Sequence, residues 1–272
     1  MRSVKLLSGI ITLLFSVNAY SQDTVPARVS AFTANINYQN KLHYFGRTDS
    51  LQSSGLFPTI GYQHKSGLYA NSNFIFYQNE VQPTTYAGAA VEVGYRFPET
   101  KHFAGNIFFT KMIYNDKSTL VQSALKAQTG INLVAQTNAV NFTFGGDLKF
   151  SDQTDIGATF GMDHLFIWTI PNTKSAFAFD PSAYLYAGTQ NFQQTYQKSK
   201  TVGGIPVGGS QTVTEQVKKF NILAYEFSAP VVFVNGIFNA SLTPAYVIPQ
   251  NLTAGEKGKN MFYFTASVGV RL

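Results

Sequence analysis

The chain has 272 residues, of which 12% are charged and 15% are aromatic, and it carries a formal net charge of +6 with no cysteine. A soluble domain usually contains about 25% charged residues, so this composition favours a protein that contacts an apolar phase. The lack of cysteine excludes disulfides, thiolate metal sites, cysteine nucleophiles and lipoprotein lipidation.

The first predicted element is an N-terminal apolar run of about twelve residues, which follows Arg2 and Lys5 and ends in a small-residue pattern at Ser21. This pattern predicts a secretory signal peptide over residues 1–21, because a spanning helix needs about 20 apolar residues. Cleavage would lower the net charge from +6 to +4. This modest positive charge gives no reason to expect a nucleic-acid partner. We expect residues 22–272 to form one exported domain.

The rest of the chain consists of segments of about ten residues in which apolar and polar side chains alternate. A tilted transmembrane strand has this length and this period of two. About twelve segments follow the pattern, over residues 28–38, 56–64, 67–78, 86–97, 103–114, 125–136, 139–150, 157–169, 176–190, 218–234, 237–248 and 261–272. The sequence therefore predicts an all-β fold, a transmembrane antiparallel up-and-down β-barrel. Ten or fourteen strands stay open, since residues 176–200 and 216–234 permit more than one division.

The connections between these segments alternate between tight turns and longer loops. Asn235-Gly236 is a strong hairpin signal. In transmembrane barrels the short turns are periplasmic and the longer loops are outside. The longest outside loops are residues 39–55 and 199–215. Glycine doublets in the second loop are candidates for an inward fold that narrows a pore, with a solvent-exposed loop as the alternative.

The last segment alternates without a break, with Phe262, Phe264 and Val268 on one face. It resembles the C-terminal assembly signal of Gram-negative outer-membrane barrel proteins, although Leu272 stands where that family usually has an aromatic residue. The resemblance implies a location in the cell outer membrane. It implies outer-membrane lipids as partners, and the barrel-assembly machinery as a partner of Met261–Leu272.

Alternation also predicts which charged side chains face the lumen, since Arg or Lys facing lipid at mid-depth costs about 2–4 kcal/mol. The predicted lumen residues are Glu92, Arg96, Lys126, Asp147, Lys149, Asp163, Asp180, Glu226 and Arg271. One interpretation is an acidic belt that selects cations or basic solutes. The other is an ion network that fills and stiffens the barrel.

Aromatic residues near the strand ends predict the interfacial girdles of a barrel. The expected girdle residues are Tyr38, Tyr62, Tyr77, Tyr95, Tyr114, Trp168 and Tyr246. Tyr184 and Tyr186 are expected to face inward, where they fill the lumen or stack on sugars.

The preferred function is a small passive, porin-like channel for small solutes or a structural surface protein. A lipid-modifying enzyme, of phospholipase or lipid A deacylase type, is the alternative. His64-Lys65-Ser66, followed by Asn71 and Asn73, resembles the His-x-Ser spacing of barrel phospholipases, but it falls on a short periplasmic turn.

His164 directly follows Asp163. A strand sends neighbouring side chains to opposite faces, so these two cannot form an acid-base pair. A transporter of hydrophobic compounds is the third possibility, against which stands the short segment before the first strand. No residue spacing predicts a cofactor or a metal site.

Overall fold

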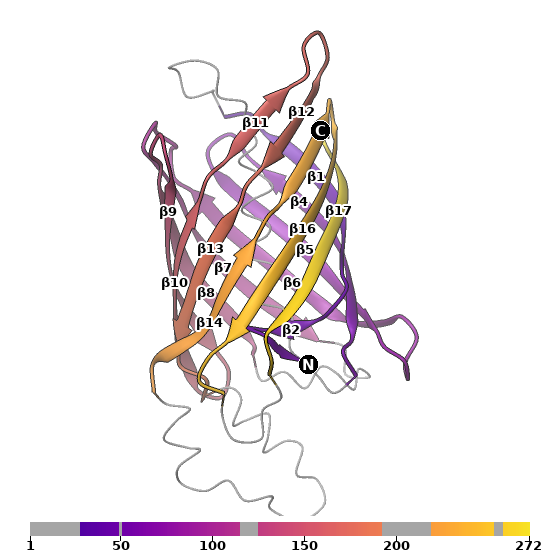
Figure 1. The fold of residues 1–272 in the computed structure, drawn as a ribbon, viewed down its shortest axis with the longest axis vertical. Helices are drawn as coiled ribbons and strands as arrows, with labels where there is room; N and C mark the ends of the chain where they lie inside the picture. The colour runs from indigo at the N-terminus through magenta and orange to yellow at the C-terminus, as the bar shows by residue number, and fades with distance from the viewer. Residues whose placement is uncertain (1–27, 49–50, 115–124, 192–218, 253–257) are drawn as a thin grey trace, which may run out of the picture.

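The structure, a computed structural model, describes residues 28–48, 51–114, 125–191, 219–252 and 258–272. Within them one antiparallel sheet closes on itself, because β1 (Ala31–Gln39) pairs with β17 (Met261–Arg271). Figure 1 shows the resulting barrel of tilted strands. The predicted signal peptide and the 199–215 loop lie outside the described residues.

Nine spanning strands of the barrel are continuous, and three others are each divided in two. Between β1 and β17 the continuous strands are β4 (Ser54–Gln63), β5 (Leu68–Gln78), β6 (Thr85–Arg96), β7 (Phe103–Tyr114), β8 (Ala127–Ala135), β9 (Asn141–Phe150) and β16 (Phe238–Pro249). The divided strands are β10 (Thr154–Asp163) with β11 (Phe166–Thr169), β12 (Ser175–Phe179) with β13 (Ser182–Gly188), and β14 (Asn221–Ser228) with β15 (Val231–Asn235). The described residues thus form a twelve-strand barrel, which confirms the predicted fold class.

The breaks in the divided strands lie side by side in the wall. Pro181 and Pro230 stand at two of them, and proline removes a donor from the strand ladder. The ladder continues through single bonds at this level. His164 N donates to Pro181 O at 3.3 Å, and Asp180 N donates to Pro230 O at 3.0 Å. The wall is therefore least regular beside Asp180.

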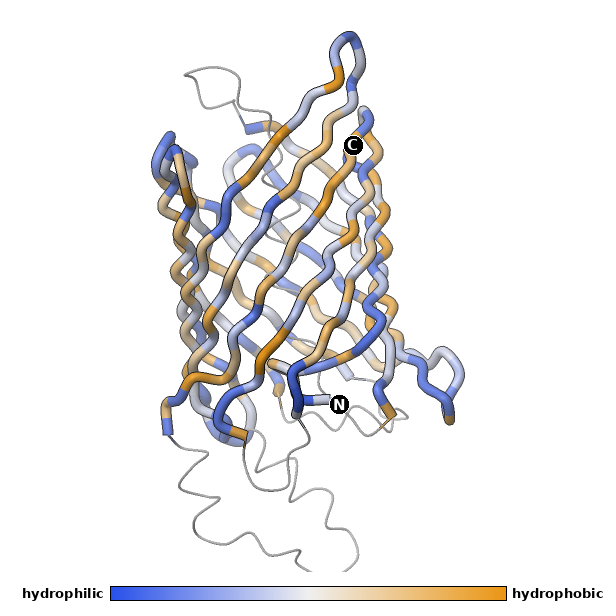
Figure 2. Tube along the Cα trace, in the orientation of Figure 1, coloured by the Kyte–Doolittle hydropathy of each residue, from blue (hydrophilic) through white to orange (hydrophobic). Residues whose placement is uncertain are grey.

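The barrel has an apolar outer face and a largely polar inner face, and Figure 2 shows the alternation along the strands. Outward side chains such as Ile36, Val93, Ile113 and Phe262 are exposed. An apolar belt of this extent is stable only against lipid. No helix within the described residues is long and apolar enough to cross a membrane.

The short connections gather at one end of the barrel. Phe32 and Leu272 exchange two backbone hydrogen bonds of 2.8 Å at that end, which is the upper end in Figure 1. We call it the inner end, because short turns are periplasmic in transmembrane barrels, and we call the opposite end the outer end. A two-residue hairpin, β2 (His43–Tyr44) with β3 (Arg47–Thr48), lies at the outer end, apart from the wall.

Candidate functional site

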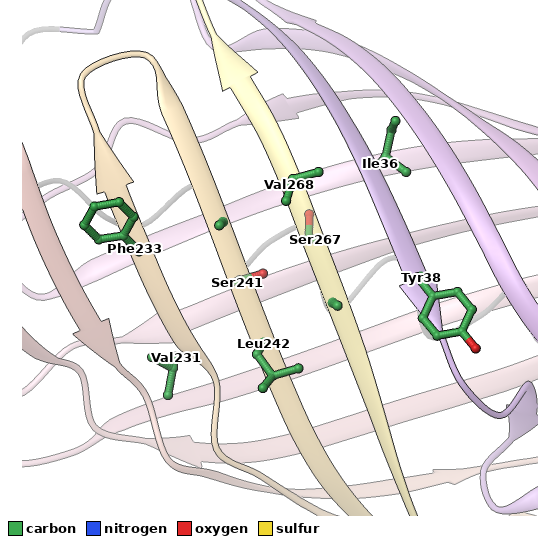
Figure 3. A pocket seen from close by; sticks show the side chains of 10 residues that line it. Ile36, Tyr38, Val231, Phe233, Ser241, Leu242, Ser267 and Val268 are labelled. Carbon is green, nitrogen blue, oxygen red and sulfur yellow. The ribbon is translucent and has the colours of Figure 1, made fainter.

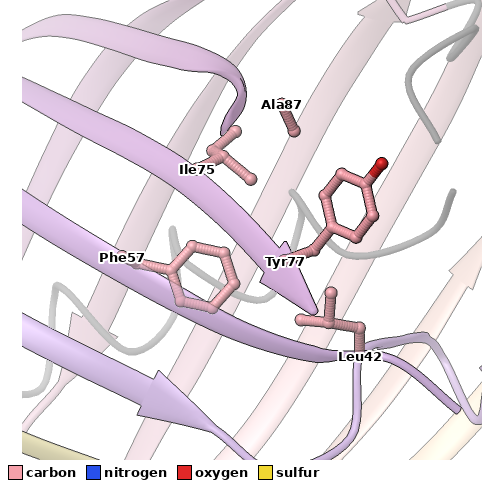
Figure 4. Close-up of a cluster of buried hydrophobic side chains, with 5 residues drawn as sticks. All are labelled: Leu42, Phe57, Ile75, Tyr77 and Ala87. Carbon is pink, nitrogen blue, oxygen red and sulfur yellow. The ribbon is translucent and has the colours of Figure 1, made fainter. Parts of the chain in front are cut away.

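Residues 40–48, here called the strap, follow β1 and fold into the outer mouth of the barrel. Leu42, His43, Tyr44 and Arg47 are at most 7% exposed, although they belong to a connection between strands. Leu42 packs against an apolar cluster from the inner faces of β4, β5 and β6, which consists of Phe57, Ile75, Tyr77 and Ala87 (Figure 4). The strap is therefore part of the barrel interior.

The girdle prediction is wrong for Tyr77 and Tyr114. Tyr114 lies on the inward face of β7, where it packs against the buried Met112. Trp168 and Tyr246 are 54% and 41% exposed on the outside of the barrel, as expected of girdle residues, but Tyr77 is only 2% exposed. Tyr77 shares the inward face of β5 with Tyr69 and Asn73. Tyr77 lies near the end of β5 as predicted, but its side chain faces the lumen and not the lipid.

The other side of the strap contacts the opposite part of the wall. The Phe45 ring lies 4.8 Å from the ring of Tyr186 on β13. Arg47 is fully buried, and its guanidinium donates to Leu223 O at 3.1 Å and to Gln250 O at 2.9 Å. Leu223 has no partner on β13 because the register shifts there. The bulge exposes its carbonyl to the strap.

These contacts make the strap cross the mouth. On one side of the mouth the strap contacts β4, β5 and β6, and on the other side it contacts β13. Four strands, β7, β8, β9 and β10, separate β6 from β13 along the described sheet. In a ring of twelve strands this separation is close to a diameter. Among the described residues, the strap therefore covers the outer mouth except for the part beside β7–β10.

The turn of the strap has a demanding backbone. Phe45 and Gly46 have φ angles of +50° and +76° between the two paired residues of the hairpin. Glycine accepts such angles readily, whereas a bulky residue is strained by about 1–2 kcal/mol. A Cβ atom at position 46 would lie 2.9 Å from Pro249 Cδ. The contact of Phe45 with Tyr186 offsets part of the strain.

His43 is buried inside the strap. Its ring lies edge-on to Tyr263 of β17, with a centroid distance of 4.2 Å, and Nδ1 accepts a hydrogen bond of 3.2 Å from Gly46 N. Burial lowers the pKa of His43 from 6.5 to about 3. The imidazole is therefore neutral at neutral pH, and acidification opposes the folded position of the strap.

Three predicted lumen carboxylates come together on neighbouring strands. Asp163 ends β10, Asp180 lies at the break before β13, and Glu226 belongs to β14. Asn141 Nδ2 donates to Asp163 Oδ2 at 2.8 Å, and the hydroxyl of Tyr263 hydrogen-bonds Glu226. These residues form an acidic wall that faces the lumen.

Three of the predicted lumen residues form ion pairs near the outer end. Lys149 Nζ lies 2.8 Å from Asp147 Oδ2, and Gln128 Nε2 donates to the same oxygen at 3.0 Å. Lys126 lies at the outer rim, where its side chain is 62% exposed and forms a 2.9 Å ion pair with Asp152. Lys126 is thus further from the lumen than the alternation suggested, because β8 begins only at the next residue.

The arginines gather at the inner end. Arg96 and Arg271 lie close enough to interact electrostatically, and Arg28 joins them by donating to the carbonyl of Arg96 at 2.9 Å. Further along β6, Glu92 accepts a hydrogen bond of 3.0 Å from Thr110 Oγ1. The lumen is therefore basic at its inner end and acidic along the β10–β14 wall.

The residues of the enzyme alternative are not assembled into a lipid-facing site. His64 Nδ1 and Ser66 Oγ are 2.9 Å apart on an exposed short turn. Asn71 and Asn73, however, are at most 8% exposed on the inward face of β5. His164 packs against Phe166, with ring centroids 4.3 Å apart. The structure thus favours a lumen function over this candidate.

An apolar groove lies on the outside of the barrel, over β15, β16, β17 and β1 (Figure 3). Phe233, Leu242, Ile36 and Val268 border it, and the small side chain of Ala266 lies between them. It belongs to the apolar belt that contacts lipid acyl chains. We therefore place the functional site in the lumen.

The sequence did not identify the strap, although it contained a signal. Leu42, Tyr44 and Phe45 are three apolar or aromatic residues within a predicted outside loop. Water would surround them if that loop extended from the membrane. Arg28 was also missed, because it stands at the start of a predicted strand.

Comparison with known proteins finds matches among solved structures but none among protein families or curated sequences. The NanC porin is similar with a TM-score of 0.47 and 11% identity, over 89% of this chain and 100% of that one. The KdgM porin, solved with disordered oligogalacturonate, gives 0.45 and 9%, over 88% and 98%. The COG4313 outer-membrane channel from Pseudomonas putida F1 gives 0.45 and 9%, over 94% and 100%. The barrel fold of this chain rests on its own strand pairing, described above.

Proposed function

We propose that the protein is an outer-membrane channel through which small hydrophilic solutes diffuse passively. The observation that carries this proposal is a closed barrel whose inner face bears buried polar and charged side chains, such as Asn37, Asn73 and Glu226. Eight strands enclose only a packed interior, and twelve enclose more space. The strap then limits the size of solute that enters from outside.

The nine predicted charged residues would set ion selectivity. Asp147 and Lys149 neutralise one another, so the net effect would come from the acidic wall and from the arginines of the inner end. Export by residues 1–21 and assembly through Met261–Leu272 belong to the same proposal. They are supported by the sequence patterns described above.

Liposome swelling tests the proposal. Vesicles that contain the purified protein should swell in small sugars and not in large ones, because the strap narrows the mouth. Vesicles without protein provide the baseline. If the folded protein allows no swelling even with the smallest sugar, the lumen is filled and the protein is a structural barrel.

A further inference from the structure

The three residues of the acidic wall form regular steps along the lumen. Asp163 pairs with Ser182, which is two residues beyond Asp180, and Glu226 pairs with Tyr184, two residues further along the same strand. A strand rises about 3.3 Å per residue, so the carboxylates follow one another in steps of about 7 Å along the strand direction. They also stand on three different strands, which are about 4.8 Å apart. They make a ladder and do not converge on one point.

Two of these carboxylates have an unused oxygen. Asp180 and Glu226 are 5% and 6% exposed, and among the described residues Asp180 Oδ1 and Glu226 Oε2 have no hydrogen-bond partner. A buried acceptor without a donor is unfavourable. Both side chains lie on the inward face of the wall, where the protein encloses these two oxygens. A solute in the lumen supplies the missing donors when the neighbouring side chains move aside.

Tyrosine rings line the same steps. Tyr184 packs over Gly161, where an added Cβ atom would lie 2.2 Å from the ring. Tyr184 and Tyr186 are nearly parallel, with centroids 6.1 Å apart and an interplanar angle of 13°. Aromatic faces attract cations and also contact methylene groups. The absence of a side chain at Gly161 leaves the ring flat against the wall.

We propose that this wall binds a linear aliphatic polyamine during passage through the channel. Its protonated amino groups would donate to Asp180, Asp163 and Glu226 in turn, and its methylene chain would lie along Tyr184 and Tyr186. A divalent metal ion needs several oxygens at 2.0–2.6 Å from one point, and carboxylates separated by more than about 7 Å do not provide them. The inference rests on the proposed channel function, because the solute reaches this wall through the lumen.

Calorimetric titration with spermidine tests the site directly. The full chain, purified from membranes, is compared with the double variant Asp180→Asn, Glu226→Gln, which keeps side-chain shape and removes two charges. We expect spermidine affinity to fall at least roughly tenfold, since charge-assisted hydrogen bonds are lost. The matched control is Asp152→Asn at the exposed rim, whose affinity should stay within about twofold of the wild type. Heat-modifiable gel migration verifies that each variant is folded.

Equal spermidine affinity in the wild type and the double variant would overturn the site. Equally tight binding of Mg²⁺ or of a monoamine of similar length would overturn it too, because neither uses the spacing of the ladder. Current recordings separate the two proposals. If the protein conducts ions but does not bind spermidine, the polyamine site is contradicted and the channel function is supported. If the protein binds spermidine but does not conduct, the site is supported and the channel function is contradicted.

Discussion

Replacing Arg47 with alanine should release the strap from the barrel wall. Arg47 is fully buried and connects the strap to the outer ends of β14 and β16 through the carbonyls of Leu223 and Gln250. Alanine removes these two hydrogen bonds, and also the donation to Phe45 O at 3.2 Å and the long contact with Asn251 O at 3.5 Å. The rest of the strap sequence is kept. The barrel wall, which the strap does not complete, should remain folded.

The magnitude follows from the hydrogen bonds to Leu223 O and Gln250 O. A hydrogen bond from a charged donor contributes about 1.5–3 kcal/mol. Leu223 O keeps a second donor, Gln250 N at 2.8 Å, and water reaches the mouth when the strap leaves. We therefore expect a net loss of about 3 kcal/mol for the closed position. At about 1.4 kcal/mol per factor of ten, the ratio of closed to released strap falls roughly a hundredfold.

Single-channel recording and chymotrypsin digestion measure the release. Arg47→Ala should show a larger conductance than the wild type and faster cleavage after Tyr44 or Phe45. Lys41→Ala is the matched control, since Lys41 is a cation of the strap whose side-chain hydrogen bond to Phe262 O, at 3.0 Å, is exposed. Its effect should stay within about 0.5 kcal/mol. If Arg47→Ala changes neither readout, the strap does not close the mouth.

Three other results should follow from the same geometry. Burial lowers the pKa of His43 from 6.5 to about 3, so the stabilisation that the neutral ring gives the closed strap is complete above pH 6.5 and is lost as the pH falls toward 3. At pH 5 the loss is about 2 kcal/mol, and conductance should rise between pH 7 and 5 in the wild type but not in His43→Gln. Gly46→Ala should destabilise the closed strap by about 1–2 kcal/mol, which faster chymotrypsin cleavage would reveal; unchanged cleavage would count against the turn geometry. Neutralising Glu92, Asp163 and Asp180 together, with Gln or Asn, should lower the cation preference in a salt gradient, and an unchanged reversal potential would contradict their role.

The fold could be predicted because its physical cause is local in the sequence. Each spanning strand must present apolar side chains to lipid at every second residue, and this period is visible without tertiary contacts. Residues 237–248 and 261–272 were each recovered as one strand, β16 and β17. The divided strands were also found, because their breaks at Pro181 and Pro230 do not change the alternation on either side.

The site was predicted less completely because its geometry depends on contacts between distant segments. Alternation placed Asp180 and Glu226 on the inner face, yet their spacing along the wall depends on the register between β13 and β14. Arg47 could not be assigned, since its acceptors lie 176 and 203 residues away in the chain. Lys126 shows a limit of prediction from alternation, because the alternating pattern does not show at which residue a strand begins.

The central claim is that the lumen conducts, and single-channel recording of the purified full chain in a planar bilayer tests it most directly. The reversal potential in a salt gradient is taken in the same experiment. We expect discrete conductance steps and a reversal potential whose sign shows that cations carry the larger current. A barrel that is folded by its gel migration but electrically silent would contradict the claim and would identify the strap and the lumen side chains as a permanent filling.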